Sequence, residues 1–100
     1  MNNFRTLDLA ISLYRDINKL KLGRAMQNQF DRALLSVYLN LSEGSAKPTS
    51  RDRRKYYFIS YASLKEVTTI LELKEINIYN KQINCLAAHI WKLAHNPGGV

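Results

Sequence analysis

The chain of 100 residues is long enough for one domain and too short for two. Its hydrophobic share of 46% and charged share of 23% exclude an intrinsically disordered chain. Lysine and arginine outnumber aspartate and glutamate by 15 to 8, which gives a formal net charge of +7. We therefore expect the partners of this protein to be anionic.

Breaker residues are scarce and clustered, which predicts long helices. The first helix is expected over residues 4–22, where apolar side chains recur at spacings of three and four. The second is expected over residues 25–41. It has one apolar stripe and two further leucines, Leu35 and Leu39, on another side. A helix that is apolar on two faces needs two apolar neighbours, which suggests a second subunit.

The third helix is expected over residues 50–74, with Ser50 as its N-cap after Pro48. Its predicted core line consists of Tyr56, Ile59, Ser63, Val67 and Ile70, and Leu64 and Leu71 widen it. The fourth is expected over residues 79–95, with Trp91 as a packing anchor. Four amphipathic segments with short connections, and no alternating strand pattern, predict an all-α, antiparallel up-and-down four-helix bundle in one domain, 1–100.

The supply of metal ligands is thin. Cys85 and His89 share a helical face, but two ligands do not make a site, so we interpret them as a core cysteine and a surface histidine and expect no metal and no cofactor. A lone cysteine also fits a reducing cytoplasm. The N-terminal segment has no small-residue cleavage site, and no apolar stretch approaches 18 residues, so neither export nor membrane spanning is expected.

Over half of the net charge lies between residues 47 and 55. The cations there are Lys47, Arg51, Arg53, Arg54 and Lys55, which with Asp52 give +4. These side chains suit phosphates of a nucleic-acid backbone, and Tyr56 and Tyr57 beside them suit base stacking. A solvated helix start with tyrosines in the core explains the same residues, and both interpretations remain open.

Four polar residues, Arg32, Asn40, Glu43 and Glu66, stand on or beside apolar helices. The two carboxylates permit general acid/base chemistry, yet no nucleophile with a base, phosphate-binding glycine loop or metal quartet accompanies them. We therefore expect no catalytic residues. The preferred interpretation is that Arg32 pairs with one or both glutamates, while Asn40 and Glu43 fix the end of the second helix.

The centre of the chain resembles the bacterial four-helix bundle proteins that are encoded within intervening sequences of 23S ribosomal RNA genes. The resemblance rests on NLSEG at residues 40–44, SLKE at residues 63–66, and Gln29, Arg32, Ala33 and Ser36 before them. It extends over residues 4–73 and begins at Phe4 and Arg5, which are similar to the usual opening phrase of the family. It marks Asn40, Glu43, Gly44, Ser63 and Glu66 as architectural residues.

The resemblance implies a homopentameric ring, which would cover the additional apolar faces. It also implies a relation to the accessory variability (Avd) proteins of diversity-generating retroelements, which bind nucleic acid and a reverse transcriptase. The leading hypothesis is a non-enzymatic, basic, oligomeric module that binds RNA or DNA through backbone phosphates. The alternative is a protein-interaction scaffold, or an accessory subunit of a partner such as a reverse transcriptase, in which nucleic-acid binding is secondary.

Overall fold

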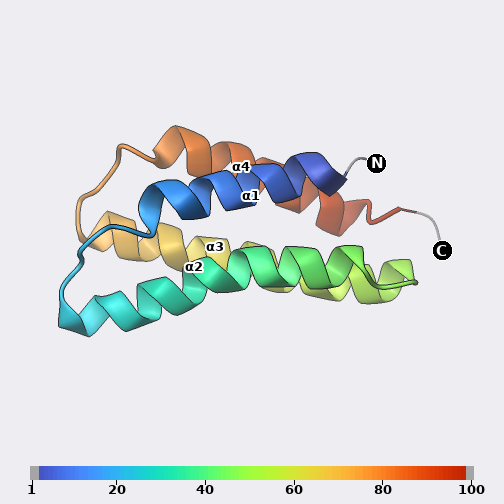
Figure 1. Ribbon diagram of the computed structural model, residues 1–100. Coiled ribbons are helices and arrows are strands. Elements are labelled where there is room, and N and C mark those ends of the chain that lie inside the picture. The colour runs from blue at the N-terminus through green and yellow to red at the C-terminus, as the bar shows by residue number, and fades with distance from the viewer. Residues whose placement is uncertain (1–2, 99–100) are drawn as a thin grey trace.

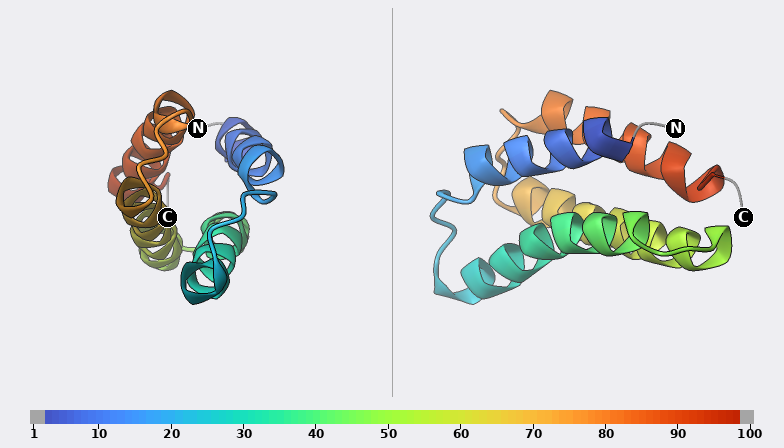
Figure 2. Two further views of the ribbon diagram at one scale, coloured as in Figure 1. Left: turned by 90° about the vertical axis from the view of Figure 1, so that its left-hand side faces the viewer. Right: turned by 45° about the vertical axis from the view of Figure 1, so that its right-hand side comes forward.

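The computed structural model describes residues 3–98, with side chains from residue 5 onward, and these residues form a four-helix bundle without strands (Figure 1). The helices are α1 (Asn3–Ile17), α2 (Arg24–Ser45), α3 (Ser50–Leu73) and α4 (Asn80–His95). They are arranged around one axis, with α1 and α4 over α2 and α3 (Figure 2). The contact between α2 and α3 is the most extensive. The all-helical prediction is confirmed for the described residues.

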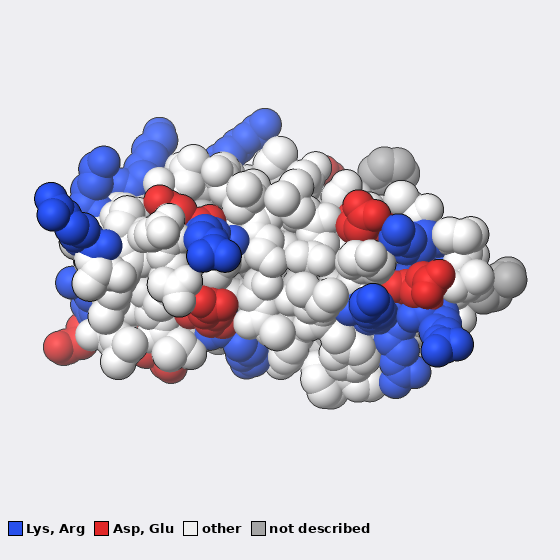
Figure 3. Space-filling model, turned by 90° about the horizontal axis from the view of Figure 1, so that it is seen from below, with Lys and Arg blue, Asp and Glu red and all other residues white. Residues whose placement is uncertain are grey.

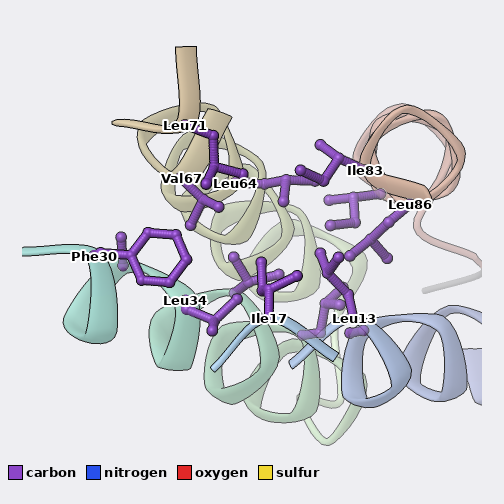
Figure 4. Close-up of a cluster of buried hydrophobic side chains, with 14 of the residues drawn as sticks. Leu13, Ile17, Phe30, Leu34, Leu64, Val67, Leu71, Ile83 and Leu86 are labelled. Atoms are coloured by element: carbon purple, nitrogen blue, oxygen red, sulfur yellow. The ribbon is translucent and has the colours of Figure 1, made fainter. Parts of the chain in front are cut away.

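Each helix contributes one apolar stripe to a common core (Figure 4). The stripes have the spacing of three and four residues that places side chains on one side of a helix. The labelled members are Leu13 and Ile17 from α1, Phe30 and Leu34 from α2, Leu64, Val67 and Leu71 from α3, and Ile83 and Leu86 from α4. This interior determines which side chains remain outside for binding.

The first helix is shorter than predicted, because it ends at Ile17 and not at residue 22. Leu20 and Leu22 continue the apolar pattern, but the chain turns after Ile17, and Leu22 packs into the core from the connection, 2% exposed. The backbone N–H of Leu22 donates to Gln27 Oε1 at 2.9 Å. Gly23 follows with φ +86°, a conformation that favours glycine, so the continued hydrophobicity belongs to a loop.

The second helix is longer than predicted, because it continues from residue 41 to Ser45. Gly44 looks like a breaker in the sequence, yet it lies inside the last turn and is buried against α3. A Cβ atom built on Gly44 would lie 2.9 Å from Cε1 and 3.0 Å from Cδ1 of Tyr57. Glycine is therefore used here for close approach of two helices, not for termination.

The start of α3 and the buried positions in its first half also differ from expectation. Thr49 is the N-cap instead of Ser50, and its hydroxyl accepts from the backbone N–H of Asp52 at 3.3 Å. In the first half of α3 the buried side chains are Tyr57 and Ser60, each one position later than the predicted Tyr56 and Ile59, whereas Leu64, Val67, Ile70 and Leu71 are buried as predicted. Ser60 is tolerated at this buried position because its hydroxyl donates to Val37 O at 2.7 Å across the contact with α2.

Candidate nucleic-acid interface

Three of the five predicted cations lie at one end of the bundle with their side chains exposed. Arg51, Arg54 and Lys55 occupy the first two turns of α3, and we call them the basic end. Figure 3 shows lysine and arginine gathered where the α2–α3 connection lies, at the right of that view, and again at the opposite end of the molecule. Helical spacing places the three side chains on the outer side of α3, where phosphate oxygens could reach them.

A shallow pocket opens beside the basic end and is lined by Thr49, Arg51, Asp52 and Lys55. Two cations here face one carboxylate, and the hydroxyl of Thr49 is engaged as the N-cap. The pocket contains no pair of nucleophile and base. It can attract an anion, and Asp52 reduces the attraction.

Lys47 is partly neutralised by its own helix. Its Nζ lies 3.0 Å from Glu43 Oε2 and 5.1 Å from the centre of the Tyr56 ring. The hydrogen bond that Lys47 donates to Glu43, and then the negative charge of Glu43, raise the pKa of Lys47 above its ordinary value of 10.5. The resulting stabilisation of the folded protein is fully present below pH 10.5, and it is lost as the pH rises through the higher pKa that Lys47 has in the folded state. Lys47 is thus charged at neutral pH, but its charge already has a partner.

Arg53 has a structural position that its sequence context does not suggest. Its Nε donates to Pro97 O at 2.8 Å and its Nη1 donates to Lys47 O at 3.0 Å. The half-buried guanidinium thereby joins the α2–α3 connection to the segment after α4. These bonds direct the head group inward, and the interpretation of Arg53 as a phosphate ligand loses support.

Replacing Arg53 with methionine is expected to lower the free energy of unfolding by about 2 kcal/mol, because charge-assisted hydrogen bonds are lost and two carbonyl groups lose their donor. Urea denaturation followed by circular dichroism measures the change. Arg51→Met is the matched control, and as a surface substitution it should change stability by about 0.5 kcal/mol or less. Equal stability of the two variants would contradict the structural role.

The predicted polar motif forms a seam between α2 and α3. Asn40 Nδ2 donates to Ser36 Oγ at 2.9 Å, and the two hydroxyl oxygens of Ser36 and Ser63 are 2.7 Å apart. Ser63 Oγ donates to Ile59 O at 3.0 Å, so Ser36 is the donor to Ser63. Each hydroxyl group therefore donates one hydrogen bond and accepts another. Asn40 and Ser63 thus contribute to the hydrogen bonds between α2 and α3, and Gly44 lies at their close approach.

The predicted pairing of Arg32 with Glu43 or Glu66 is wrong. All three side chains are exposed, and within the described part of the chain Arg32 forms no ion pair with either glutamate. Glu43 pairs with Lys47 instead. The pairing assumed burial, and exposed charges need no partner.

The two carboxylates that could serve an acid/base mechanism are far apart. Counted from the contact of Ser36 with Ser63, Glu43 lies toward one end of the bundle and Glu66 toward the other. The rise of the two helices separates them by about 15 Å along the axis. Both are accessible, but they do not share a site.

Cys85 was expected in the core and is exposed. Its Sγ lies 4.0 Å from His89 Nδ1, while Nδ1 contacts Cys85 O at 2.8 Å and Nε2 accepts from Arg5 Nε at 3.3 Å. Both ring nitrogens of His89 are therefore engaged. Residues 3–98 contain no cluster of three or more groups that could hold a metal ion, and no helix among them has the length and apolarity to cross a membrane.

Sequence reasoning missed an aromatic cluster on the outer side of α3 and α4. It consists of Phe58, Tyr61, Trp91 and His95, in which Trp91 contacts the other three rings and Phe58 also contacts His95. Trp91 is 48% exposed, so it is more than the packing anchor that was expected. The available signal was the spacing of three or four residues within each pair, but the pairing of the two helices had to be known.

The model of one protein family, described as 23S rRNA-intervening sequence protein, matches residues 4–95 of the chain. This range includes all the residues of the polar seam, the basic end and the aromatic cluster. No curated protein and no solved structure matches the chain.

Proposed function

The chain belongs to the 23S rRNA-intervening sequence protein family, and we propose, from the geometry of its basic end, that it is a non-enzymatic module that binds RNA or DNA through backbone phosphates. The observation that carries the proposal is the alignment of Arg51, Arg54 and Lys55 on one accessible side of α3. Three exposed cations on a rigid helix can follow a row of phosphates without reading the base sequence.

The distribution of acidic residues also favours binding of a polyanion on the side of the molecule that α3 forms. Residues 53–65 and 76–98 contain no aspartate or glutamate, and these segments supply the middle part of α3 and all of α4. The acidic residues of α3 are Asp52 in its first turn and Glu66 and Glu72 toward its end, and the others lie in α1, in α2 and at Glu75. The field over the α3–α4 side is therefore positive, which attracts a polyanion and accelerates its association.

Fluorescence anisotropy with a labelled oligonucleotide, at several salt concentrations, tests the proposal. Replacing Arg51, Arg54 and Lys55 together with alanine should lower the affinity and reduce the slope of log K against log salt by about 3, since each phosphate contact contributes about 0.9. The effect should be similar for different base sequences.

The matched control replaces Lys19, Lys21 and Arg24 with alanine, because these exposed cations lie at the opposite end of the bundle. The two triple variants have the same net charge. An equal loss of affinity in both would show that total charge, and not the basic end, attracts the ligand. Absence of binding by the parent protein at low salt would refute the proposal.

We also propose that the functional unit is a homo-oligomer, with the pentamer as the expected state. Support comes from the outer face of the α2–α3 layer, where Leu35, Leu39 and Ile59 are 43%, 53% and 39% exposed. Figure 3 views this face, and its middle carries few charged groups. Apolar surface of this kind is typical of protein contacts.

The same apolar face is the specific observation that favours the second candidate function, a scaffold for another protein such as a reverse transcriptase. The two candidates differ in what the basic end does. A pull-down with the triple variant of Arg51, Arg54 and Lys55 separates them, because a scaffold would retain its protein partner after nucleic-acid binding is lost.

A further inference from the structure

The aromatic cluster forms a continuous line of ring contacts from α3 to α4. Phe58 packs edge-on against Trp91, with ring centres 6.4 Å apart, and against His95 at 5.3 Å. Tyr61 lies 5.2 Å from Trp91 at a tilt of 53°. The ring centres of Trp91 and His95 are 3.8 Å apart. The four rings are thus held in fixed relative positions by two rigid helices.

A cation covers each end of this line. The guanidinium of Arg54 lies 5.7 Å from the centre of the Phe58 ring, and Nζ of Lys65 lies 5.3 Å from the centre of the Tyr61 ring. Both cations are exposed, and the residues between them on α3 include no carboxylate. From Arg51 to Lys65 the basic and aromatic side chains extend for about 21 Å along α3.

We propose that the aromatic cluster binds the bases of single-stranded RNA or DNA by stacking, while Arg54 and Lys65 contact phosphates on either side. This inference rests on the proposed function and adds the class of nucleic acid to it. Base stacking on aromatic side chains next to a cationic track is the physical basis of single-strand binding without sequence preference. A duplex would gain less, because its base faces are already stacked inside the helix.

Packing between α3 and α4 does not account for the whole cluster. A tryptophan that served the interior alone would be enclosed, whereas Trp91 is 48% exposed and the adjoining His95 is also exposed. A cationic ligand is disfavoured, because Arg54 and Lys65 already lie over the outer rings and would repel it. Charge complementarity instead selects a polyanion that has aromatic groups of its own.

Trp91 is the sole tryptophan of the chain, so intrinsic fluorescence reports directly on the cluster. The experiment titrates the full-length protein at low salt with an oligothymidylate, with an abasic strand of the same length, and with a duplex. We expect quenching of tryptophan fluorescence by the oligothymidylate and little quenching by the abasic strand. Anisotropy of the same labelled strands gives the affinities.

Two substitutions test the rings themselves. Tyr61→Leu and Trp91→Leu should each weaken binding of the oligothymidylate by about 5- to 150-fold, the range that stacking on one base provides. Affinity for the abasic strand should change less than twofold. Tyr38→Leu is the matched control, because Tyr38 is a half-buried tyrosine on α2, away from the cluster. Thermal denaturation by circular dichroism verifies that each variant is folded at the assay temperature.

The outcomes separate this inference from the proposed function. If the oligothymidylate and the abasic strand bind equally and without quenching, phosphate binding stands and base stacking is refuted. If polyglutamate of equal charge displaces the oligothymidylate as effectively as unlabelled oligothymidylate does, the cluster is a site for acidic peptides and the inference fails. If no strand binds at low salt, both proposals fail.

Discussion

Replacing Gly44 with alanine is expected to destabilise the bundle by about 1–3 kcal/mol, although alanine is the better helix former by about 1 kcal/mol. The new methyl group would lie 2.9 Å and 3.0 Å from two ring carbons of Tyr57 and 3.1 Å from Cβ of Tyr56. The Tyr57 ring is 0% exposed and is enclosed by the core, so it cannot rotate away. Either α2 and α3 separate or the ring is displaced.

Urea denaturation measures this effect, with Ser42→Ala as the control. Ser42 is exposed on the same part of α2, and alanine there should leave stability unchanged or raise it slightly. In the double variant Gly44→Ala with Tyr57→Leu, the loss should be smaller than the sum of the two single losses, because the smaller side chain makes room for the methyl group. A Gly44→Ala variant as stable as the parent would show that the helices do not approach so closely.

The fold could be predicted because all four helices follow the apolar period of 3.6 residues, which depends on local spacing alone. The ends of the helices could not be predicted in this way, because they depend on tertiary contacts. Leu22 is apolar because it packs into the core from a loop, and Gly44 has no side chain because α2 approaches Tyr57 closely there. The core positions in the first half of α3 were ambiguous, since the adjacent aromatics Tyr56 and Tyr57 allow two neighbouring core lines.

The candidate site could be predicted in part. Composition alone identifies a basic segment, but which cations remain accessible depends on distant partners. Arg53 donates to Pro97 O, 44 residues away, and no local pattern indicates that bond. Lys47, in contrast, pairs with Glu43 at the spacing of four residues that sequence can reveal.

The aromatic cluster shows the same limit more strongly. Its members come from two helices, and the antiparallel packing of α3 on α4 places the ring centres of Tyr61 and Trp91 5.2 Å apart. Their exposure depends on the rotation of both helices, and the first half of α3 buries Tyr57 and Ser60 in place of the predicted Tyr56 and Ile59. Sequence therefore predicts that aromatic residues are present, whereas the structure places them beside Arg54 and Lys65.

Replacing Leu39 and Ile59 together with glutamate is expected to convert the proposed oligomer into a monomer of 11.6 kDa. The two side chains are 53% and 39% exposed on α2 and α3, on either side of the seam that Ser36 and Ser63 form. At a contact between copies, a glutamate would be buried without a partner, and an uncompensated buried charge costs about 3–5 kcal/mol. That cost corresponds to a rise of the dissociation constant by about two to three and a half orders of magnitude. Light scattering coupled to size exclusion measures the mass.

The matched control replaces Leu73 and Ile78 with glutamate, because these side chains are even more exposed, at 65% and 77%, and lie at the α3–α4 connection. The control has the same change in charge and hydrophobicity and should retain the parent mass.

Oligomeric display of several basic ends would raise the apparent affinity for a long strand through avidity, by up to about 10²–10⁴-fold. The monomeric variant should lose this gain for long strands and keep the affinity of the parent for short ones. A parent protein that is monomeric at micromolar concentration would refute self-association, and an unchanged mass of the Leu39→Glu and Ile59→Glu variant would assign the contact to another face.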